Sequence, residues 1–221
     1  MVHSTKGIVA CTQPLAASAG CKILELGGNS MDASIAVSAC LCVLEPASTG
    51  VAGDCFLLLF ENKNNKIYGV NGTGRSPSKL NIDLLKEELD VDPFPTRLPF
   101  ESVHTVTVPG AIAGWMDALE KYGSGRVTLQ QILQPAIDLC ELGHPISEVS
   151  ASLTQMSWSK LLKQNKHNSD LLECFAPAGE PTNPPKEGEI VINKPLAKVF
   201  KSILEKQGKL GFYSGEVADA I

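Results

Sequence analysis

Arg75 is the residue of this chain whose type and surroundings most clearly suggest chemistry. It follows two glycines in a short run, residues 71–77, with the sequence NGTGRSP. A guanidinium is planar, permanently charged and able to hold a carboxylate through two parallel hydrogen bonds. We therefore predict that Arg75 binds a carboxylate of a substrate. A second interpretation stays open, in which Arg75 only pairs with a structural carboxylate of the protein, as arginines in loops often do.

A glycine-containing turn, residues 50–54 with the sequence GVAGD, lies shortly before this run. Such turns can present backbone N–H groups to an anion. A mononucleotide loop, however, stands between a strand and a helix and ends in Lys-Ser or Lys-Thr, whereas this turn precedes an apolar run typical of a strand. We expect a tight turn with glycine at positive φ and no nucleotide site. Asp54 is interpreted as a residue that supports a site without carrying its chemistry.

The other candidate nucleophiles and ligands form no recognisable pattern. The histidines, His3, His104, His144 and His167, lie in unrelated contexts, and no Gly-x-Ser-x-Gly segment stands at a strand end. The seven cysteines include no Cys-x-x-Cys pair, and the spacing of Cys40 and Cys42 does not suit a zinc knuckle. We therefore predict no metal site.

Composition and charge exclude several classes of partner. The chain has 221 residues, 43% of them hydrophobic, and carries 19 basic against 24 acidic residues. It has no basic stripe with interleaved aromatic residues, so we expect no nucleic-acid partner. Most cysteines lie in apolar runs, where a free thiol behaves as a small buried hydrophobe, and this favours a reducing compartment. No apolar leader and no run of the ~20 residues that span a membrane is seen, so we expect a cytoplasmic location without membrane contact.

Local patterns predict helices and strands in alternating pairs. Helices are expected at 14–26, at 30–44 with Asn29 or Ser30 as the cap, at 82–89 and at 195–207. A capping box at residues 128–131 opens a further helix, which Pro135 is expected to kink or split. Ser214 is expected to cap a last helix, with Glu216 in its first turn.

The predicted strands are short and apolar. They cover residues 8–11, 56–60, 66–70 and 105–108. Residues 56–60 (FLLLF) are expected to be buried on both faces and to form, with 66–70, a hairpin at the centre of a sheet. Residues 92–99 are predicted to be a surface loop, and residues 176–188, dense in proline, glycine and charge, are the candidate linker.

Several short tags, taken together, are similar in order and spacing to gamma-glutamyltransferases. They are residues 7–10 (GIVA), 13–16 (QPLA), 27–33 (GGNSMDA), 45–56 (EPASTGVAGDCF), 106–115 (VTVPGAIAGW), 134–137 (QPAI) with 141–143 (ELG), and 211–218 (GFYSGEVA). Each tag alone is unspecific, but so many in a fixed order, over essentially the whole chain, are hard to obtain by chance.

This resemblance implies a fold and separate roles for two subunits. The family consists of N-terminal-nucleophile hydrolases made as one precursor that cuts itself into a large and a small subunit. The implied fold class is α+β, as part of a four-layer αββα sandwich whose two central sheets both subunits share. Residues 1–221 would form one large-subunit segment, incomplete at its C-terminus. The nucleophilic threonine would begin the small subunit, so we expect no catalytic residue in this chain, Arg75 on the substrate side, and no cofactor.

The loop around Arg75 departs from the pattern of well-studied members, which read Arg-Glu-x-Ala-Pro. Counting back from Pro77 puts Thr73 at the arginine position and moves the guanidinium two residues on. This version resembles a divergent, oxamate amidohydrolase-like branch, and it weakens glutathione as the expected donor. The implied function is acyl transfer from a γ-glutamyl or related small-molecule amide to water or an amine. The implied protein partner is the protein's own small subunit. The alternative is a noncatalytic truncated copy that acts as an interaction partner or regulator.

Overall fold

The computed structural model describes residues 2–89, 97–99, 102–164, 171–180 and 182–221. The chain divides into two compact units: unit 1 comprises Met1–Gly50 and Met116–Ile221, and unit 2 comprises Val51–Trp115. The linker predicted at 176–188 marks neither boundary, so this interpretation is wrong. The segment is tied into unit 1, because the Ala178 N–H donates to the Ile190 carbonyl at 2.8 Å and the Gln155 side chain donates to the Pro185 carbonyl at 2.9 Å.

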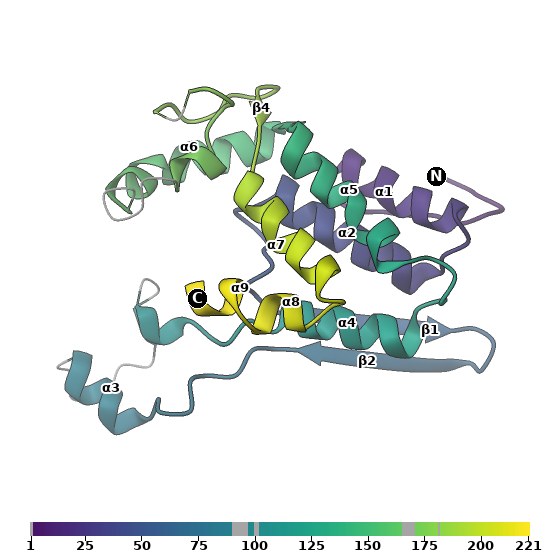
Figure 1. The fold of residues 1–221 in the computed structure, drawn as a ribbon, viewed down its shortest axis with the longest axis horizontal. Coiled ribbons are helices and arrows are strands. Elements are labelled where there is room, and N and C mark those ends of the chain that lie inside the picture. Colours follow the sequence, from purple (N-terminus) through teal and green to yellow (C-terminus); the bar gives the residue numbers. More distant parts are fainter. Residues whose placement is uncertain (1, 90–96, 100–101, 165–170, 181) are drawn as a thin grey trace. The chain divides into compact units, whose positions relative to one another are not determined.

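Helices that pack side by side form the core of unit 1 (Figure 1). Helix α1 (Pro14–Glu25) packs on α2 (Ser30–Leu44), α2 packs on α5 (Leu129–Leu142), and α5 packs on α7 (Lys194–Glu205). Small residues let α1 and α2 approach closely, since a Cβ on Gly20 would come within 2.7 Å of Val37. The predicted helices at 14–26, 30–44 and 195–207 are confirmed. Pro135 lies inside α5 without splitting it.

Shorter elements complete unit 1. They are helix α6 (Glu148–Gln164), the strands β3 (His144–Pro145) and β4 (Ile190–Val191), which pair antiparallel, the 3-10 turn η2 (Leu172–Cys174), and the helices α8 (Leu210–Tyr213) and α9 (Glu216–Ala220). The residue before α9 is Gly215, at φ 73°, and no side chain caps the helix. The prediction that Ser214 caps it is therefore wrong, because the left-handed glycine separates Ser214 from the first turn.

Unit 2 contains a β-hairpin made of β1 (Cys55–Glu61) and β2 (Lys66–Gly72). The strands pair antiparallel with Phe56 opposite Asn71 and Phe60 opposite Ile67, as the predicted hairpin required. The expected burial on both faces is wrong. In the part of the chain that the structure describes, this sheet has two strands, and Phe56, Leu58 and Phe60 on one face are 72%, 83% and 56% exposed. A continuous apolar run typically indicates a central strand, but here nothing in the described structure covers that face.

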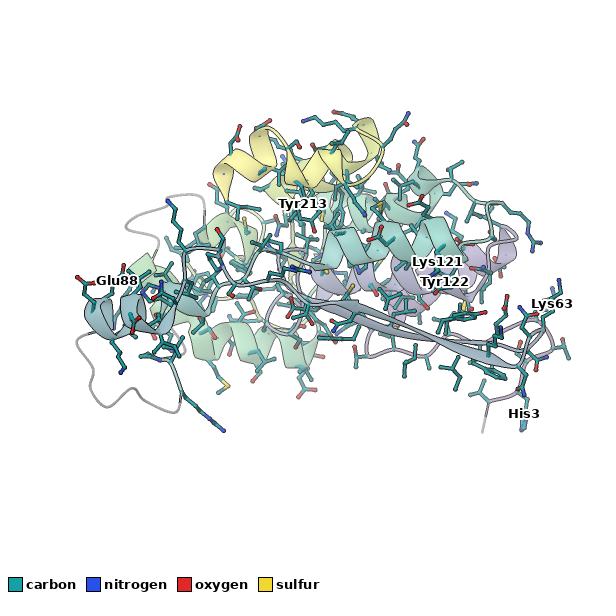
Figure 2. The ribbon with its side chains drawn as sticks, turned by 90° about the horizontal axis from the view of Figure 1, so that it is seen from below. His3, Lys63, Glu88, Lys121, Tyr122 and Tyr213 are labelled. Atoms are coloured by element: carbon teal, nitrogen blue, oxygen red, sulfur yellow. The ribbon has the colours of Figure 1, made fainter. Side chains whose placement is uncertain are left out.

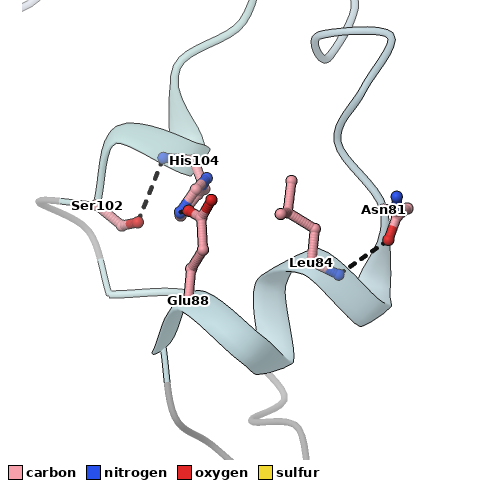
Figure 3. Close-up of polar contacts among 5 residues, drawn as sticks. All are labelled: Asn81, Leu84, Glu88, Ser102 and His104. Carbon is pink, nitrogen blue, oxygen red and sulfur yellow. Dashed lines mark hydrogen bonds and ion pairs between the residues drawn. The ribbon is translucent and has the colours of Figure 1, made fainter.

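The rest of unit 2 is helix α3 (Ile82–Leu89), the 3-10 turn η1 (Val103–Thr105) and the start of helix α4 (Ala111–Tyr122), inside which the unit boundary falls. Asn81 caps α3 by accepting from the Leu84 N–H at 2.9 Å, and His104 Nε2 on η1 lies 2.8 Å from the Glu88 carboxylate on α3 (Figure 3). In Figure 2, Glu88 on α3 and Lys63 in the turn between β1 and β2 lie at opposite ends of unit 2.

Two predicted strands are not formed. Residues 105–108 comprise the last residue of η1 and a segment without secondary structure, in which the Val108 N–H donates to the Arg75 carbonyl. Residues 8–11 belong to no helix or strand, and no strand of the described structure pairs with them. An extended segment becomes a strand only where a neighbour takes its hydrogen bonds, and local sequence does not report that neighbour. The predicted loop at 92–99 lies mostly outside the described residues.

Candidate functional site

The loop that carries Arg75 leaves β2 at Gly72 and is held by hydrogen bonds on each of its next residues. The Asn71 side chain accepts from the Thr73 N–H at 3.0 Å and from the Thr73 hydroxyl at 2.5 Å. Asp54 Oδ1 accepts from the Gly74 N–H at 2.7 Å. The Arg75 carbonyl accepts from the Val108 N–H at 2.9 Å. The backbone that leads to the guanidinium is therefore fixed from both sides.

Glycines let this loop touch the segment that precedes α4. A Cβ on Gly74 would lie 2.0 Å from the Val108 carbonyl oxygen, and a Cβ on Gly110 would lie 2.1 Å from the Gly72 carbonyl oxygen. Real Cβ atoms do not approach an oxygen so closely. Both positions therefore require glycine for close backbone contact.

The turn at residues 50–54 is bonded to the start of helix α4 through one backbone carbonyl, that of Gly53. Gly53 accepts from the N–H groups of Gly110 at 3.0 Å and Ala111 at 2.9 Å, which open α4. This carbonyl bonds N–H groups at the helix end where an anion would otherwise bind. Neither Gly50 nor Gly53 has a positive φ, so that expectation is wrong. What Gly53 provides is a carbonyl that accepts from the start of α4.

Cys55, next to Asp54, is a packing residue. Its sulfur fills the space left by two missing side chains, since a Cβ on Gly114 would lie 2.3 Å and one on Gly72 2.5 Å from Sγ. Burial raises the pKa of the Cys55 thiol, and the neighbouring Asp54 carboxylate raises it further. A thiol held protonated in this way is a poor nucleophile.

Arg75 itself is exposed, and none of the ion pairs formed between described residues uses it. Its predicted pairing with a structural carboxylate therefore gains no support within the described ranges, and its binding of a substrate carboxylate stays a prediction. Sequence reasoning missed the part played by Val108, which acts through its backbone and has no sequence signal. The Asn-Gly dipeptide before Thr73 was a detectable signal, because asparagine often hydrogen-bonds the backbone two residues on.

The histidines and thiols of the described structure are not gathered into a second site. His144 is buried, His3 is exposed, His104 faces Glu88, and His167 lies outside the described residues. Burial raises the pKa of Cys40 and Cys140 to about 12 and that of Cys42 to about 11, as expected for thiols that act as hydrophobic side chains. Cys21, by contrast, is exposed. Over the described ranges no group of three or more His, Cys, Asp or Glu residues could hold a metal ion.

Among the helices of the described residues, none is both long enough and apolar enough to cross a lipid bilayer.

Comparison with known proteins gives the family of the chain. Residues 16–221 match the family model of gamma-glutamyltranspeptidase, and the chain belongs to this family. It is 34% identical to the glutathione hydrolase-like YwrD proenzyme of Bacillus subtilis, over 100% of this chain and 39% of that protein. It is 31% identical to the glutathione hydrolase proenzyme of Escherichia coli, over 100% of this chain and 36% of that protein. The chain thus spans well under half the length of these relatives.

Solved structures agree with this assignment. The gamma-glutamyltranspeptidase of Helicobacter pylori superposes with a TM-score of 0.85 at 29% identity, covering 100% of this chain and 60% of that one. The cephalosporin acylase of Bacillus halodurans superposes with a TM-score of 0.80 at 35% identity, covering 94% of this chain and 37% of that one. The predicted family and its mixed helix and strand fold are confirmed.

Proposed function

We propose that the protein to which this chain belongs transfers the acyl group of a γ-glutamyl or related amide to water or an amine. The observation that carries this proposal is the family match over residues 16–221. Relatives named glutathione hydrolase proenzymes, which match 97–100% of the chain, support the same chemistry. A freed threonine attacks the amide carbonyl, its own α-amine acts as base, and backbone N–H groups hold the oxyanion.

This chain supplies the substrate side of that reaction. We assign residues 1–221 to the large subunit, with the nucleophile and base on a small subunit that is its partner. Arg75 holds the α-carboxylate of the acyl donor through a charge-assisted pair. Its exposure, and a loop backbone bonded to Asp54 and Val108, support this role. A cytoplasmic location is part of the proposal, supported by thiols such as Cys40 and Cys140 that are buried as hydrophobic side chains.

The test is Arg75→Ala in the full-length protein, assayed with a γ-glutamyl anilide. Loss of the charge-assisted pair should lower kcat/KM by roughly 30- to 1000-fold, or about 2 to 4 kcal/mol. Arg75→Lys should recover only part of this, because an ammonium lacks the planar fork. Self-cleavage of the precursor should continue, since that step acts on the chain's own peptide bond.

A matched control is Lys63→Ala, which removes an exposed cation from the hairpin turn and should leave kcat/KM unchanged. Arg75 is structural instead if its alanine variant keeps kcat/KM within about threefold of the parent. The same conclusion follows if that variant loses folding and self-cleavage together. Reading the coding sequence downstream of Ile221 separates the enzyme from the noncatalytic alternative. A threonine that begins a small-subunit pattern supports the enzyme, and a stop codon supports the truncated copy.

A further inference from the structure

We infer that Asp54 is a positioning residue, whose carboxylate holds the Arg75 loop through the Gly74 N–H and so determines where the guanidinium meets the substrate carboxylate. This inference rests on the proposed role of Arg75. Asp54 and Gly74 are 20 residues apart in sequence, and the distance from Asp54 Oδ1 to the Gly74 nitrogen is 2.7 Å.

The character of this bond suits such a role. A carboxylate that accepts from a backbone N–H makes a hydrogen bond roughly twice as strong as one between neutral groups. Gly74 directly precedes Arg75, so the bond fixes the orientation of a backbone group one residue before the guanidinium. Gly74 packs closely on Val108 through its backbone, and the Asp54 carboxylate accepts from its N–H group.

Asp54 is itself anchored on each side. The carbonyl of Gly53 accepts two N–H groups at the start of α4, at 3.0 and 2.9 Å. On the other side, Cys55 is the first residue of β1 and its sulfur fills the space beside Gly72 and Gly114. Asp54 therefore lies between a residue bonded to the start of α4 and the first residue of β1. Contacts with regular elements hold a functional group more precisely than a free loop does.

Removal of the carboxylate should loosen the loop without unfolding the unit. The Asp54 side chain is exposed, and the bond from the Val108 N–H to the Arg75 carbonyl remains in place. A misplacement of about 1 Å can lower a reaction rate by up to roughly 100-fold. The expected defect is one of substrate position, and it should depend on the substrate having the carboxylate that Arg75 binds.

The test compares Asp54→Ala and Asp54→Asn in the full-length protein. Each variant is assayed with two substrates, a γ-glutamyl anilide and a 4-aminobutyryl anilide. The second substrate lacks the α-carboxylate. Asp54→Ala should raise KM for the γ-glutamyl anilide by about tenfold or more, and change kcat and the turnover of the 4-aminobutyryl anilide much less. Asp54→Asn keeps an Oδ1 acceptor and should recover most of the loss. Asp83→Ala, an exposed aspartate on α3, is the matched control.

A second measurement needs no turnover. Hydrogen exchange of the peptide that contains Gly74, followed by mass spectrometry, should be faster in Asp54→Ala and unchanged in Asp54→Asn and Asp83→Ala. Asp54→Ala added to Arg75→Ala should cause little further loss, because the two residues act through one contact.

The inference is overturned if Asp54→Ala leaves the preference between the anilides or the Gly74 exchange unchanged, or if its loss adds in full to that of Arg75→Ala. It is also overturned if Asp54→Asn is as impaired as Asp54→Ala, or if Asp54→Ala lowers Tm by more than about 5 °C, which would make Asp54 a folding residue. These results leave the proposed role of Arg75 standing. An unchanged Arg75→Ala enzyme, in contrast, refutes that role and this inference with it.

Discussion

His144 is a buried side chain whose protonation is linked to stability. It is 3% exposed, in β3, and its Nδ1 lies 3.4 Å from the Leu139 carbonyl oxygen. Burial lowers the pKa of His144, because the imidazolium loses its hydration, and the contact with the Leu139 carbonyl opposes this shift in part. The folded protein therefore keeps His144 neutral at a pH where the unfolded chain protonates it.

We predict that this histidine makes the protein less stable as the pH falls. Its contribution is present above the unfolded pKa of about 6.5 and is lost as the pH falls through the folded pKa, because the unfolded state binds the extra proton. Urea unfolding between pH 7.5 and 5 should show a falling midpoint, and His144→Gln should flatten the curve. His3→Gln, at an exposed position, is the control. Equal slopes for the parent and His144→Gln would contradict the prediction.

At the scale of elements, the N-terminus of α2 is held both by a capping box and by bonds to the turn after α4. Asn29 and Asp32 form a capping box, in which Asp32 Oδ2 accepts from the Asn29 N–H at 2.9 Å. The same buried carboxylate accepts from the Ser124 N–H at 3.2 Å, and the Asn29 side chain donates to the Tyr122 carbonyl at 2.8 Å. One aspartate therefore caps its own helix and ties down the turn that follows α4.

We predict that Asp32→Ala lowers the free energy of unfolding by about 2 to 3 kcal/mol, because it removes both the cap and the carboxylate that accepts from the half-buried Ser124 N–H. Thr128→Ala is the comparison. It removes an exposed capping box that serves only α5, and should lower stability by about 1 kcal/mol. Chemical denaturation of both variants measures the difference. Equal losses would show that the tertiary bond of Asp32 adds nothing.

The sequence could predict those elements whose signals are local. The cap of α2, expected at Asn29 or Ser30 and found at Asn29, the capping box at Thr128, and the polar turn between β1 and β2 can each be recognised from a few neighbouring residues. Each depends on bonds between neighbours in sequence, so a single chain suffices to find them. The Ser124 partner of Asp32, which lies 92 residues away, has no such signal.

The predictions that failed depend on distant parts of the chain. Residues 8–11 and 105–108 have strand-like composition, but an extended segment needs a partner that its own residues do not encode. In the candidate site, Arg75 could be selected by residue type, and Asp54 as a supporting neighbour. The bond from Asp54 to Gly74, and the contact of Gly74 with Val108, could not be found because they join segments 20 and more residues apart.

At the scale of the whole molecule, the hairpin presents an apolar face to solvent. Phe56, Leu58 and Phe60 alternate along β1, and Ile67, opposite Phe60, is 72% exposed. Alternate residues of a strand point to the same side, so these four side chains form one patch. Soluble proteins rarely leave a contiguous patch of large apolar side chains uncovered.

We predict that residues 1–221, purified alone, bind a hydrophobic dye or aggregate through this face. Leu58→Thr, at the most exposed of these positions, should reduce dye fluorescence, while Leu153→Thr on α6, an apolar residue outside the hairpin, should change it less. Dye titration and light scattering of the variants give the measurement. A monodisperse monomer with a cooperative melt and no dye binding would contradict the prediction.

The glycines around the Arg75 loop have a consequence for the history of the gene. Every missense change at Gly72, Gly74, Gly110 or Gly114 adds a Cβ where an oxygen or a sulfur already lies within 2.5 Å. No replacement at these codons is mild, so purifying selection for a folded loop would keep them as glycine in every descendant. In a copy released from selection they would drift as freely as any surface codon. Whether these glycines are retained among descendants of the gene therefore indicates whether the loop has remained under selection.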